Sequence, residues 1–194
     1  IDGGTDGGAV DGPGPDAEPG PPTTYRLTAS DGGTDDRFGV VAISGDTIAV
    51  GAQLDDDTQT DSGAVYVFDW DPDTMVWTQT VKLKASDPIA SARFGAAVDL
   101  AGDTLVVGAP GVSMGAGVYV FERNASGSWI QAPKITSGAN YDSFGSAVAI
   151  NGTILVVGAP GDDQVQPQAG ALFLYLRGAS TFGFDEKLVD TASL

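Results

Sequence analysis

The sequence predicts an all-β fold: a partial β-propeller with three complete blades of four antiparallel strands and one additional N-terminal strand. Glycine makes up 28 of the 194 residues, and β-branched residues dominate the apolar runs, as in turn-rich β proteins. The main observation is internal repetition at a period of about 50 residues, which is typical of propeller blades. The similar segments are Phe38–Gln53, Phe94–Pro110 and Phe144–Pro160.

Each repeat is marked at several positions and not only at its start. A Phe-Gly pair opens the segment, an apolar strand leads to a turn glycine, and a second apolar strand ends at Gly-Ala. The turn glycine always precedes the glycine of Gly-Ala by six residues: Gly45 and Gly51, Gly102 and Gly108, Gly152 and Gly158. Each unit then has a strand rich in aromatic residues and a Lys-apolar pair: Lys82-Leu83, Lys134-Ile135 and Lys187-Leu188.

The three blades are expected over residues 38–85, 94–136 and 144–190. In the first blade the expected strands are Val40–Ile43, Thr47–Val50, Ala64–Phe68 and Val76–Ala85. In the second they are Ala97–Leu100, Thr104–Val107, Val118–Phe121 and Trp129–Thr136. In the third they are Ala147–Ile150, Ile154–Val157, Ala171–Tyr175 and Phe184–Val189. Asn151 and Gly152 are expected to supply the two positive-φ residues of a tight hairpin turn.

The N-terminal part divides into a linker and a strand. Residues 1–23 contain 16 Gly, Pro or Asp residues. Such a segment cannot bury enough apolar surface to offset the entropy of ordering, so a disordered linker is predicted. Its prolines favour a partly extended spacer. Residues 24–31 follow the pattern of Val81–Asp87, and this indicates the last strand of a preceding blade.

The number of blades predicts partners for the folded part. A closed propeller has four or more blades. An uncovered blade face of about 400 Å² would forfeit roughly 10 kcal/mol of apolar burial. The remaining blades are therefore expected from a longer parent chain or from self-association. A β-solenoid is the rival architecture, but solenoid repeats are usually shorter and lack hairpin turns of this kind.

Composition and charge exclude several classes of function. The formal net charge is −17, with 26 acidic and 9 basic residues, so nucleic acid is not expected as a partner. Cys and His are both absent from the sequence, which excludes disulfides, metal sites built from these residues, and catalysis by an imidazole or a thiolate. No apolar run approaches the ~20 residues of a membrane span.

The repeats resemble FG-GAP repeats, which form the blades of integrin alpha-chain propellers and occur in many secreted bacterial proteins. The motif is carried by Phe38, Gly39 and Gly51, by Phe94, Gly95 and Gly108, and by Phe144, Gly145 and Gly158. The segments Gly63–Phe68 and Lys82–Asp87 are similar to the bacterial form. The resemblance covers residues 24–194 and implies an extracellular or cell-surface location, with the N-terminal linker as a tether.

The first repeat departs from the family pattern. Gln53 replaces the proline of Gly-Ala-Pro, and one residue is missing between Phe38 and Gly45. This deletion is expected to distort the innermost strand of the first blade.

Acidic residues concentrate in two sets of loops, which the resemblance places together on the ligand-binding face of a propeller. The candidates for ligand or cation binding are Asp35, Asp36, Asp55, Asp56, Asp57, Asp61, Asp87, Asp142, Asp162 and Asp163. They could hold calcium in the weak range of ~10⁻⁴–10⁻³ M. The alternative is that they are solvated loops that keep a β-rich protein soluble. The D-x-D-x-D-G calcium hairpin of integrin-type blades is absent, and no other cofactor is expected.

No catalytic residues are expected. Ser and Thr have no His to activate them, and no pair of carboxylates stands out for hydrolysis. The favoured function is a non-enzymatic extracellular binding or adhesion module that recognises a protein or glycan through its acidic loops. Two alternatives stay open: a propeller fragment of a larger secreted carbohydrate-active or phosphodiester-cleaving enzyme, and a purely structural spacer at the cell surface. Trp77 and Trp129 suggest sugar stacking, but their fixed place before the fourth strand favours packing.

Overall fold

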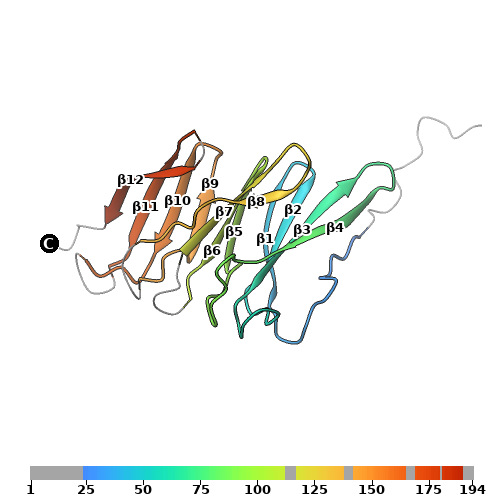
Figure 1. Ribbon diagram of the computed structural model, residues 1–194, viewed down its shortest axis with the longest axis horizontal. Helices are drawn as coiled ribbons and strands as arrows, with labels where there is room; N and C mark the ends of the chain where they lie inside the picture. Colours follow the sequence, from blue (N-terminus) through green and yellow to red (C-terminus); the bar gives the residue numbers. More distant parts are fainter. Residues whose placement is uncertain (1–23, 112–116, 138–141, 165–168, 180, 190–194) are drawn as a thin grey trace, which may run out of the picture.

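The computed structural model of the protein describes residues 24–111, 117–137, 142–164, 169–179 and 181–189. The predicted linker, residues 1–23, lies outside the described residues. The described residues form three four-stranded sheets and no helix, and in every sheet the strands lie side by side in chain order (Figure 1). This arrangement confirms the predicted all-β fold of propeller blades.

Each sheet is an antiparallel meander. The first contains β1 (Phe38–Ser44), β2 (Thr47–Ala52), β3 (Ala64–Asp71) and β4 (Val76–Leu83). The second contains β5 (Ala97–Ala101), β6 (Thr104–Ala109), β7 (Gly117–Arg123) and β8 (Trp129–Gln131). The third contains β9 (Ala147–Ile150), β10 (Ile154–Ala159), β11 (Ala171–Arg177) and β12 (Phe182–Val189).

Two strand predictions change in the structure. The second strand of every sheet runs through the Gly-Ala pair, because the pair stays in register with the third strand, as in Gly51↔Val65. β8 is shorter than the predicted strand and ends at Gln131. Pro133 interrupts the ladder because it has no N–H to donate, and Ile135 then pairs with Val118 again.

The inner hairpins show one correction. The first two turn through two residues, and the first turn residue has a positive φ: Gly45 at 53° and Gly102 at 57°. In the third hairpin only Gly152 has a positive φ, 94°, so the prediction that Asn151 also adopts one is wrong. The Asn151 side chain instead accepts a hydrogen bond of 2.9 Å from the N–H of Ile154 and closes a longer turn.

The innermost strand of the first sheet is irregular at its start. The pairing of β1 with β2 shifts register between Phe38 and Val40. Gly39 lies at this irregularity with a φ of 151°. The distortion lies in the repeat that is one residue short, as expected.

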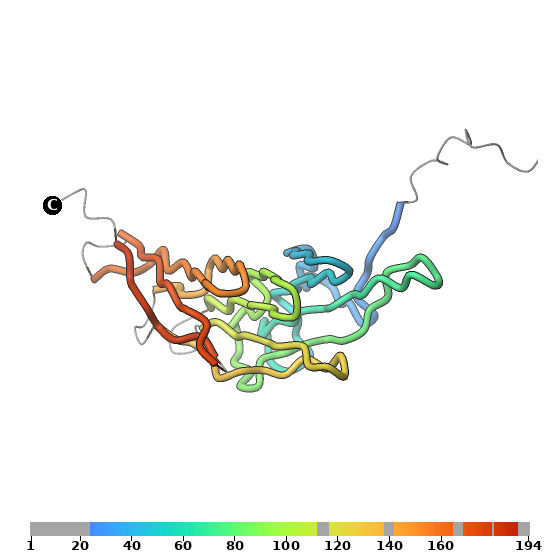
Figure 2. Tube along the Cα trace, turned by 90° about the horizontal axis from the view of Figure 1, so that it is seen from above, coloured from blue at the N-terminus to red at the C-terminus, as the bar shows by residue number. Residues whose placement is uncertain are grey.

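The three sheets stack face to face in chain order (Figure 2). We call the side of a sheet that looks toward the next sheet its forward face and the opposite side its back face. At the first interface, the forward-face residues Ala49, Val65 and Val67 pack on the back-face residues Phe94, Val98, Leu100, Leu105, Val107, Tyr119 and Phe121. At the second, Val106, Val118 and Val120 pack on Phe144, Leu155, Val157, Phe173 and Tyr175.

The phenylalanine of Phe-Gly is the centre of each interface. Phe94 is fully buried, and its ring packs edge-to-face on Tyr119 at 5.2 Å and on Phe121 at 6.0 Å. Phe144 is fully buried in the same way. Phe94 and Phe144 are therefore core residues of the two sheet interfaces.

The two glycines of the motif meet across the sheet interface. A Cβ on Gly51 would lie 2.1 Å from the carbonyl oxygen of Gly95, and a Cβ on Gly108 would lie 2.0 Å from that of Gly145. Only glycine permits this approach of two backbones. The Gly-Ala of one blade and the Phe-Gly of the next are therefore the two halves of a single contact.

The first sheet has a partly uncovered back face. Val41 and Ile43 are 65% and 64% exposed, whereas the equivalent Val98 and Leu100 of the second sheet are 9% and 5% exposed. These side chains line an apolar groove together with Leu27 and Ile48. This is the face that a preceding blade would cover.

Residues 24–31 lie against this back face. Leu27 packs there in the position that Leu83 occupies on the back face of the second sheet. Ser30 exchanges hydrogen bonds with Gln79, as Ser86 does with Gln131. The segment forms these side-chain contacts without a strand ladder, and its assignment to a preceding blade stays a prediction.

No stretch of the described residues forms a helix long and apolar enough to cross a membrane.

Candidate functional site

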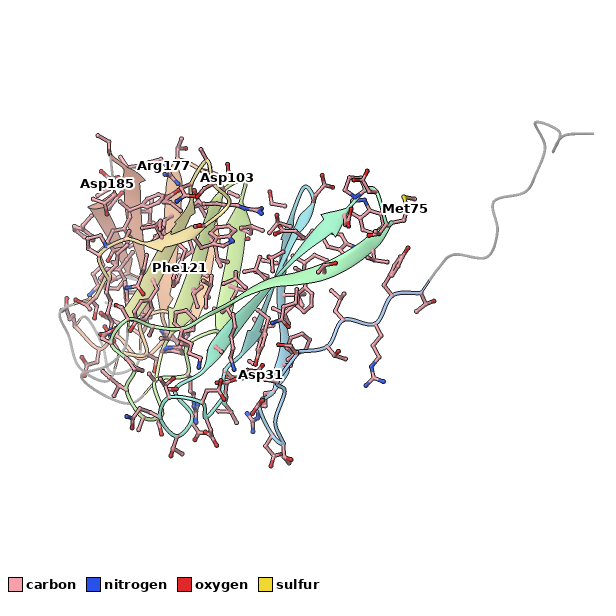
Figure 3. All side chains as sticks on the ribbon, turned by 45° about the vertical axis from the view of Figure 1, so that its right-hand side comes forward. Asp31, Met75, Asp103, Phe121, Arg177 and Asp185 are labelled. Atoms are coloured by element: carbon pink, nitrogen blue, oxygen red, sulfur yellow. The ribbon has the colours of Figure 1, made fainter. Side chains whose placement is uncertain are left out.

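Two sets of loops meet at one end of the sheets. The loop between the second and third strands donates a backbone N–H to the segment before each Phe-Gly: Leu54 to Asp36 (3.2 Å), Gly111 to Ala92 (3.0 Å) and Gly161 to Asp142 (3.0 Å). We call this end the loop face; it comprises residues 31–37, 53–63, 87–93, 110–111, 142–143 and 160–164. Figure 3 shows Asp31 at this end and Met75, Asp103 and Arg177 at the opposite end.

The first part of the loop face is organised by one lysine of β4. The Nζ atom of Lys82 lies 2.9 Å from an oxygen of Asp31 and 2.7 Å from an oxygen of Asp55, and it also contacts Asp57. Asp55 is only 2% exposed. Lys84 adds a second ion pair to Asp57 at 3.0 Å. Lys82 thus brings together two of the candidate acids, Asp55 and Asp57, and a third acid, Asp31.

The protonation of this cluster follows from its contacts. Hydrogen bonds from Lys82 and Lys84 lower the pKa of Asp57 to about 2. Hydrogen bonds from Lys82 and from the hydroxyl of Tyr66 also lower the pKa of Asp31. Burial would lower the pKa of Lys82, but its bonds to Asp31, Asp55 and Asp57 outweigh burial and raise it. Asp31, Asp57 and Lys82 therefore stay ionised near neutral pH.

An ion pair between a lysine and an acid of the loop face also occurs in each of the other two blades. Lys134 lies 3.0 Å from Asp87, and the hydroxyl of Tyr119 donates to the same carboxylate at 2.7 Å. Burial opposes ionisation of Asp87, but these two bonds still lower its pKa. In the third blade Lys187 lies 2.7 Å from Asp162, which is 3% exposed. The carboxylates of Asp87 and Asp162 are therefore held in ion pairs with Lys134 and Lys187.

These lysines also lie over the aromatic rings of the third strands. Lys82 is 5.0 Å from the ring centroid of Tyr66, Lys134 is 5.0 Å from that of Tyr119, and Lys187 is 5.2 Å from that of Phe173. Sequence reasoning found the lysines as landmarks of the repeat and missed their role as partners of the acids. In every repeat the lysine follows the aromatic residue of the third strand by 14 to 16 residues (82−66, 134−119 and 187−173), and this recurring order was the signal that could have identified the role.

The remaining candidates divide into exposed and buried acids. Asp35, Asp56 and Asp163 are exposed, and among the described residues no lysine or arginine contacts them. Asp61, with a φ of 52°, donates its N–H to the side chain of Asp56. Asp36 accepts a hydrogen bond from the N–H of Gly33 and is half-buried.

Asp142 is different from the other candidates because it is buried and no cation of the described residues pairs with it. It is 2% exposed, and one oxygen accepts the N–H of Phe144 at 3.1 Å while the other has no partner. Burial of Tyr175 and the nearby charge of Asp142 together raise the pKa of Tyr175 to about 12. This acid is positioned by the backbone N–H of Phe144 and is not displayed to solvent.

The sequence also predicts that these loops could hold calcium weakly. Calcium takes six to eight oxygen ligands, usually with several carboxylates. Among the described residues no three acidic side chains come together as a metal site. The inner hairpins turn through short segments, and the acids closest together share lysines instead. Ion pairs therefore account for Asp31, Asp55, Asp57, Asp87 and Asp162, and weak calcium binding by the remaining acids stays a prediction.

The two tryptophans suggested for sugar stacking pack within the sheets. Trp77 lies 5.5 Å from Trp70 and against the apolar cluster of the first sheet. Trp129 packs against the first interface, and the guanidinium of Arg123 lies 5.8 Å from its ring. Neither ring is a free platform for a sugar, as the position before the fourth strand indicates.

The lowered pKa values predict an acid-sensitive stability. A carboxyl with a folded pKa below its unfolded value near 3.8 stabilises the fold above that value, and this contribution is lost as pH falls through the folded pKa. For Asp57 the window runs from about pH 5 down to about pH 2. We expect urea midpoints to fall over this window in the natural chain and to fall less in Asp57→Asn. Equal slopes would contradict the pairing. Comparison of the two chains removes the general effect of protonating the other acids.

A chain of stacked four-stranded meanders with glycine contacts between them defines a propeller-type repeat protein. The sequence profile of the FG-GAP repeat family matches residues 23–68, 77–121 and 129–175. The protein therefore belongs to the FG-GAP repeat family. The second and third matched units begin in β4 and β8, the last strands of the preceding sheets, and all three units end in the third strand of a sheet. A search of curated proteins found no match to this chain.

Proposed function

We propose that the protein is a non-enzymatic recognition module that acts outside the cell and binds a protein or glycan ligand through its loop face. The family is generally non-enzymatic and typically occurs in extracellular proteins. The observation that supports the proposal is the division of acids at the loop face. Some carboxylates are bound to lysines of the fold, whereas Asp35, Asp56 and Asp163 are exposed and contact no described cation.

The exposed acids give the loop face a chemical preference. Loops fixed on a rigid sheet commonly carry binding residues. The net charge of −17 adds a long-range attraction for cationic partners. A basic segment of a protein, or a glycan that carries amino groups, fits this surface. The N-terminal linker would hold the loop face away from its point of attachment.

The face can be tested with matched charge removals. The first variant combines Asp35→Asn, Asp56→Asn and Asp163→Asn at the loop face. The control combines Asp46→Asn, Asp73→Asn and Asp103→Asn, three exposed acids of the hairpins at the other end. At low ionic strength we expect the first variant to bind a decalysine peptide about tenfold more weakly, since three exposed charges contribute about 0.5 kcal/mol each. The control should lose less.

The binding results distinguish ligand recognition by the loop face from a purely structural role as a spacer. Equal losses in both triple variants would contradict the loop face as the binding surface. A glycan array probed with the natural chain and both variants tests the second ligand class in the same way. No binding in either assay, with folding unchanged, would favour the structural spacer.

A further inference from the structure

The forward face of the third sheet is an uncovered aliphatic surface. It consists of alternate residues of β10 and β11 and one residue of β12: Ile154, Val156, Leu172, Leu174, Leu176 and Leu188. Leu172, Leu176 and Leu188 are 47%, 45% and 44% exposed. The equivalent Val65 and Val118 on the forward faces of the first two sheets are fully buried. The face thus continues the series of the two internal interfaces, and a further blade is the occupant whose chemistry matches it.

An arginine links the sheets at both internal interfaces. Arg123 of the second sheet forms two bonds to Asp69 of the first sheet, at 3.0 and 2.9 Å, and one to Thr47. Arg177 of the third sheet repeats this with Glu122, at 2.9 Å, and with the hydroxyl of Thr104. We call this contact the arginine link. Its acceptors are a threonine and an acid that pair across the second and third strands.

The third sheet offers no acceptor for a further arginine link. The pair at the equivalent place is Ile154↔Leu176, and neither side chain has an oxygen. An arginine from a following blade would lose hydration against these side chains and gain no partner. The third sheet therefore has an apolar pair at the position where the first two sheets have a threonine and an acid.

The first sheet shows the matching change on a back face. Trp70 stands at the position that Arg123 and Arg177 occupy in the other sheets, next to Asp69 in β3. Its ring packs on Tyr25 at 5.9 Å and on Trp77 at 5.5 Å. An apolar residue is therefore compatible with this position of the blade.

We propose that the forward face of the third sheet docks a further FG-GAP blade whose third strand carries an aromatic or aliphatic residue in place of the arginine. The link position then determines which blades can be neighbours. An acid on the forward face selects a blade with arginine, and Leu176 selects a blade without it. Gly158 also leaves room for the backbone of a following Phe-Gly, as Gly51 and Gly108 do for Gly95 and Gly145. At present a Cβ on Gly158 would meet only Ala147, at 3.3 Å.

The test is a set of four tandem chains. Residues 137–189 are repeated directly after Val189, which keeps the natural spacing from the strand-four lysine to the next Phe-Gly. The repeated copy carries either its own Arg177 or Arg177→Trp. The original third sheet is either natural or carries Ile154→Thr with Leu176→Glu. Hydrogen exchange of the original β10 and β11 amides reports docking.

We expect matched pairs to dock. On the natural face, the copy with Arg177→Trp should slow exchange in β11 about tenfold or more relative to the copy with arginine. On the face with Ile154→Thr and Leu176→Glu the preference should reverse. Equal protection by both copies on the natural face, or no protection in any of the four chains, would overturn the proposal.

A glycine variant provides an independent check. Gly158→Ala should leave the single chain folded and should abolish docking in the protected tandem chain, because the next Phe-Gly backbone could no longer approach. Unchanged protection in the tandem chain with Gly158→Ala would show that the copy does not dock as a blade, and would equally overturn the proposal.

Discussion

Gly108→Ala is expected to lower the free energy of unfolding more than any other single substitution in the sheets. A Cβ at this position would lie 2.0 Å from the carbonyl oxygen of Gly145, and backbone atoms on both sides cannot move without separating two sheets. Buried backbone overlaps of this kind cost about 4 kcal/mol or more. This is a large part of the roughly 5–15 kcal/mol that stabilises a domain. Urea unfolding followed by the fluorescence of the three tryptophans measures the loss.

The chain contains a matched control for this substitution. Gly158 has the same place in the Gly-Ala-Pro motif, but its nearest neighbour would be the Cβ of Ala147 at 3.3 Å. We expect Gly158→Ala to change stability by about 1 kcal/mol or less, because alanine is at least as favourable as glycine in a strand. Similar losses of unfolding free energy in the two variants would show that glycine is required by the conformation of its own strand. The close contact between blades would then not be the reason for the glycine.

The repeat predicts the fold well because the period and the alternation are both local properties of the sequence. Three hairpins, three aromatic third strands and the glycine motif place almost every strand of the sheets. The errors arise where one residue changes the local geometry. Pro133 removes an N–H and shortens β8, and the Asn151 side chain closes its hairpin by accepting hydrogen bonds.

The candidate site was less predictable than the fold. Acid density identified the loop face but could not separate Asp55, which is buried against Lys82, from Asp56, which is exposed one residue later. The difference depends on which side chain points to β4, and the lysine lies 27 residues away in the sequence. Pairings between strands that are distant in sequence determine such contacts, and composition does not encode them.

The arginine link could not be inferred from charge pattern alone. Arg123 and Asp69 are 54 residues apart and belong to different sheets. Once the repeats are aligned in the register of the structure, the exchange of acid for Leu176 becomes visible. The pairing register of the second and third strands is the information that the structure adds to the sequence here.

Lys82→Met is expected to be the most damaging substitution at the loop face. Asp55 is 2% exposed and has Lys82 as its cation partner at 2.7 Å, so methionine would leave a buried charge with only the Tyr66 hydroxyl and a backbone N–H. Removing one partner of a buried ion pair costs about 3–5 kcal/mol. Methionine keeps the length of the apolar stem, so the loss reports the charge.

Lys84→Met is the control, because Lys84 is more exposed and contacts only Asp57 among the described acids. An exposed pair of this kind contributes about 1 kcal/mol or less. We therefore expect urea midpoints at pH 7 to fall much further for Lys82→Met than for Lys84→Met. Adding Asp55→Asn to Lys82→Met should recover part of the loss, since it removes the uncompensated charge. A double variant no more stable than Lys82→Met would mean that the lysine acts through its contact with the Tyr66 ring, and not through the buried carboxylate.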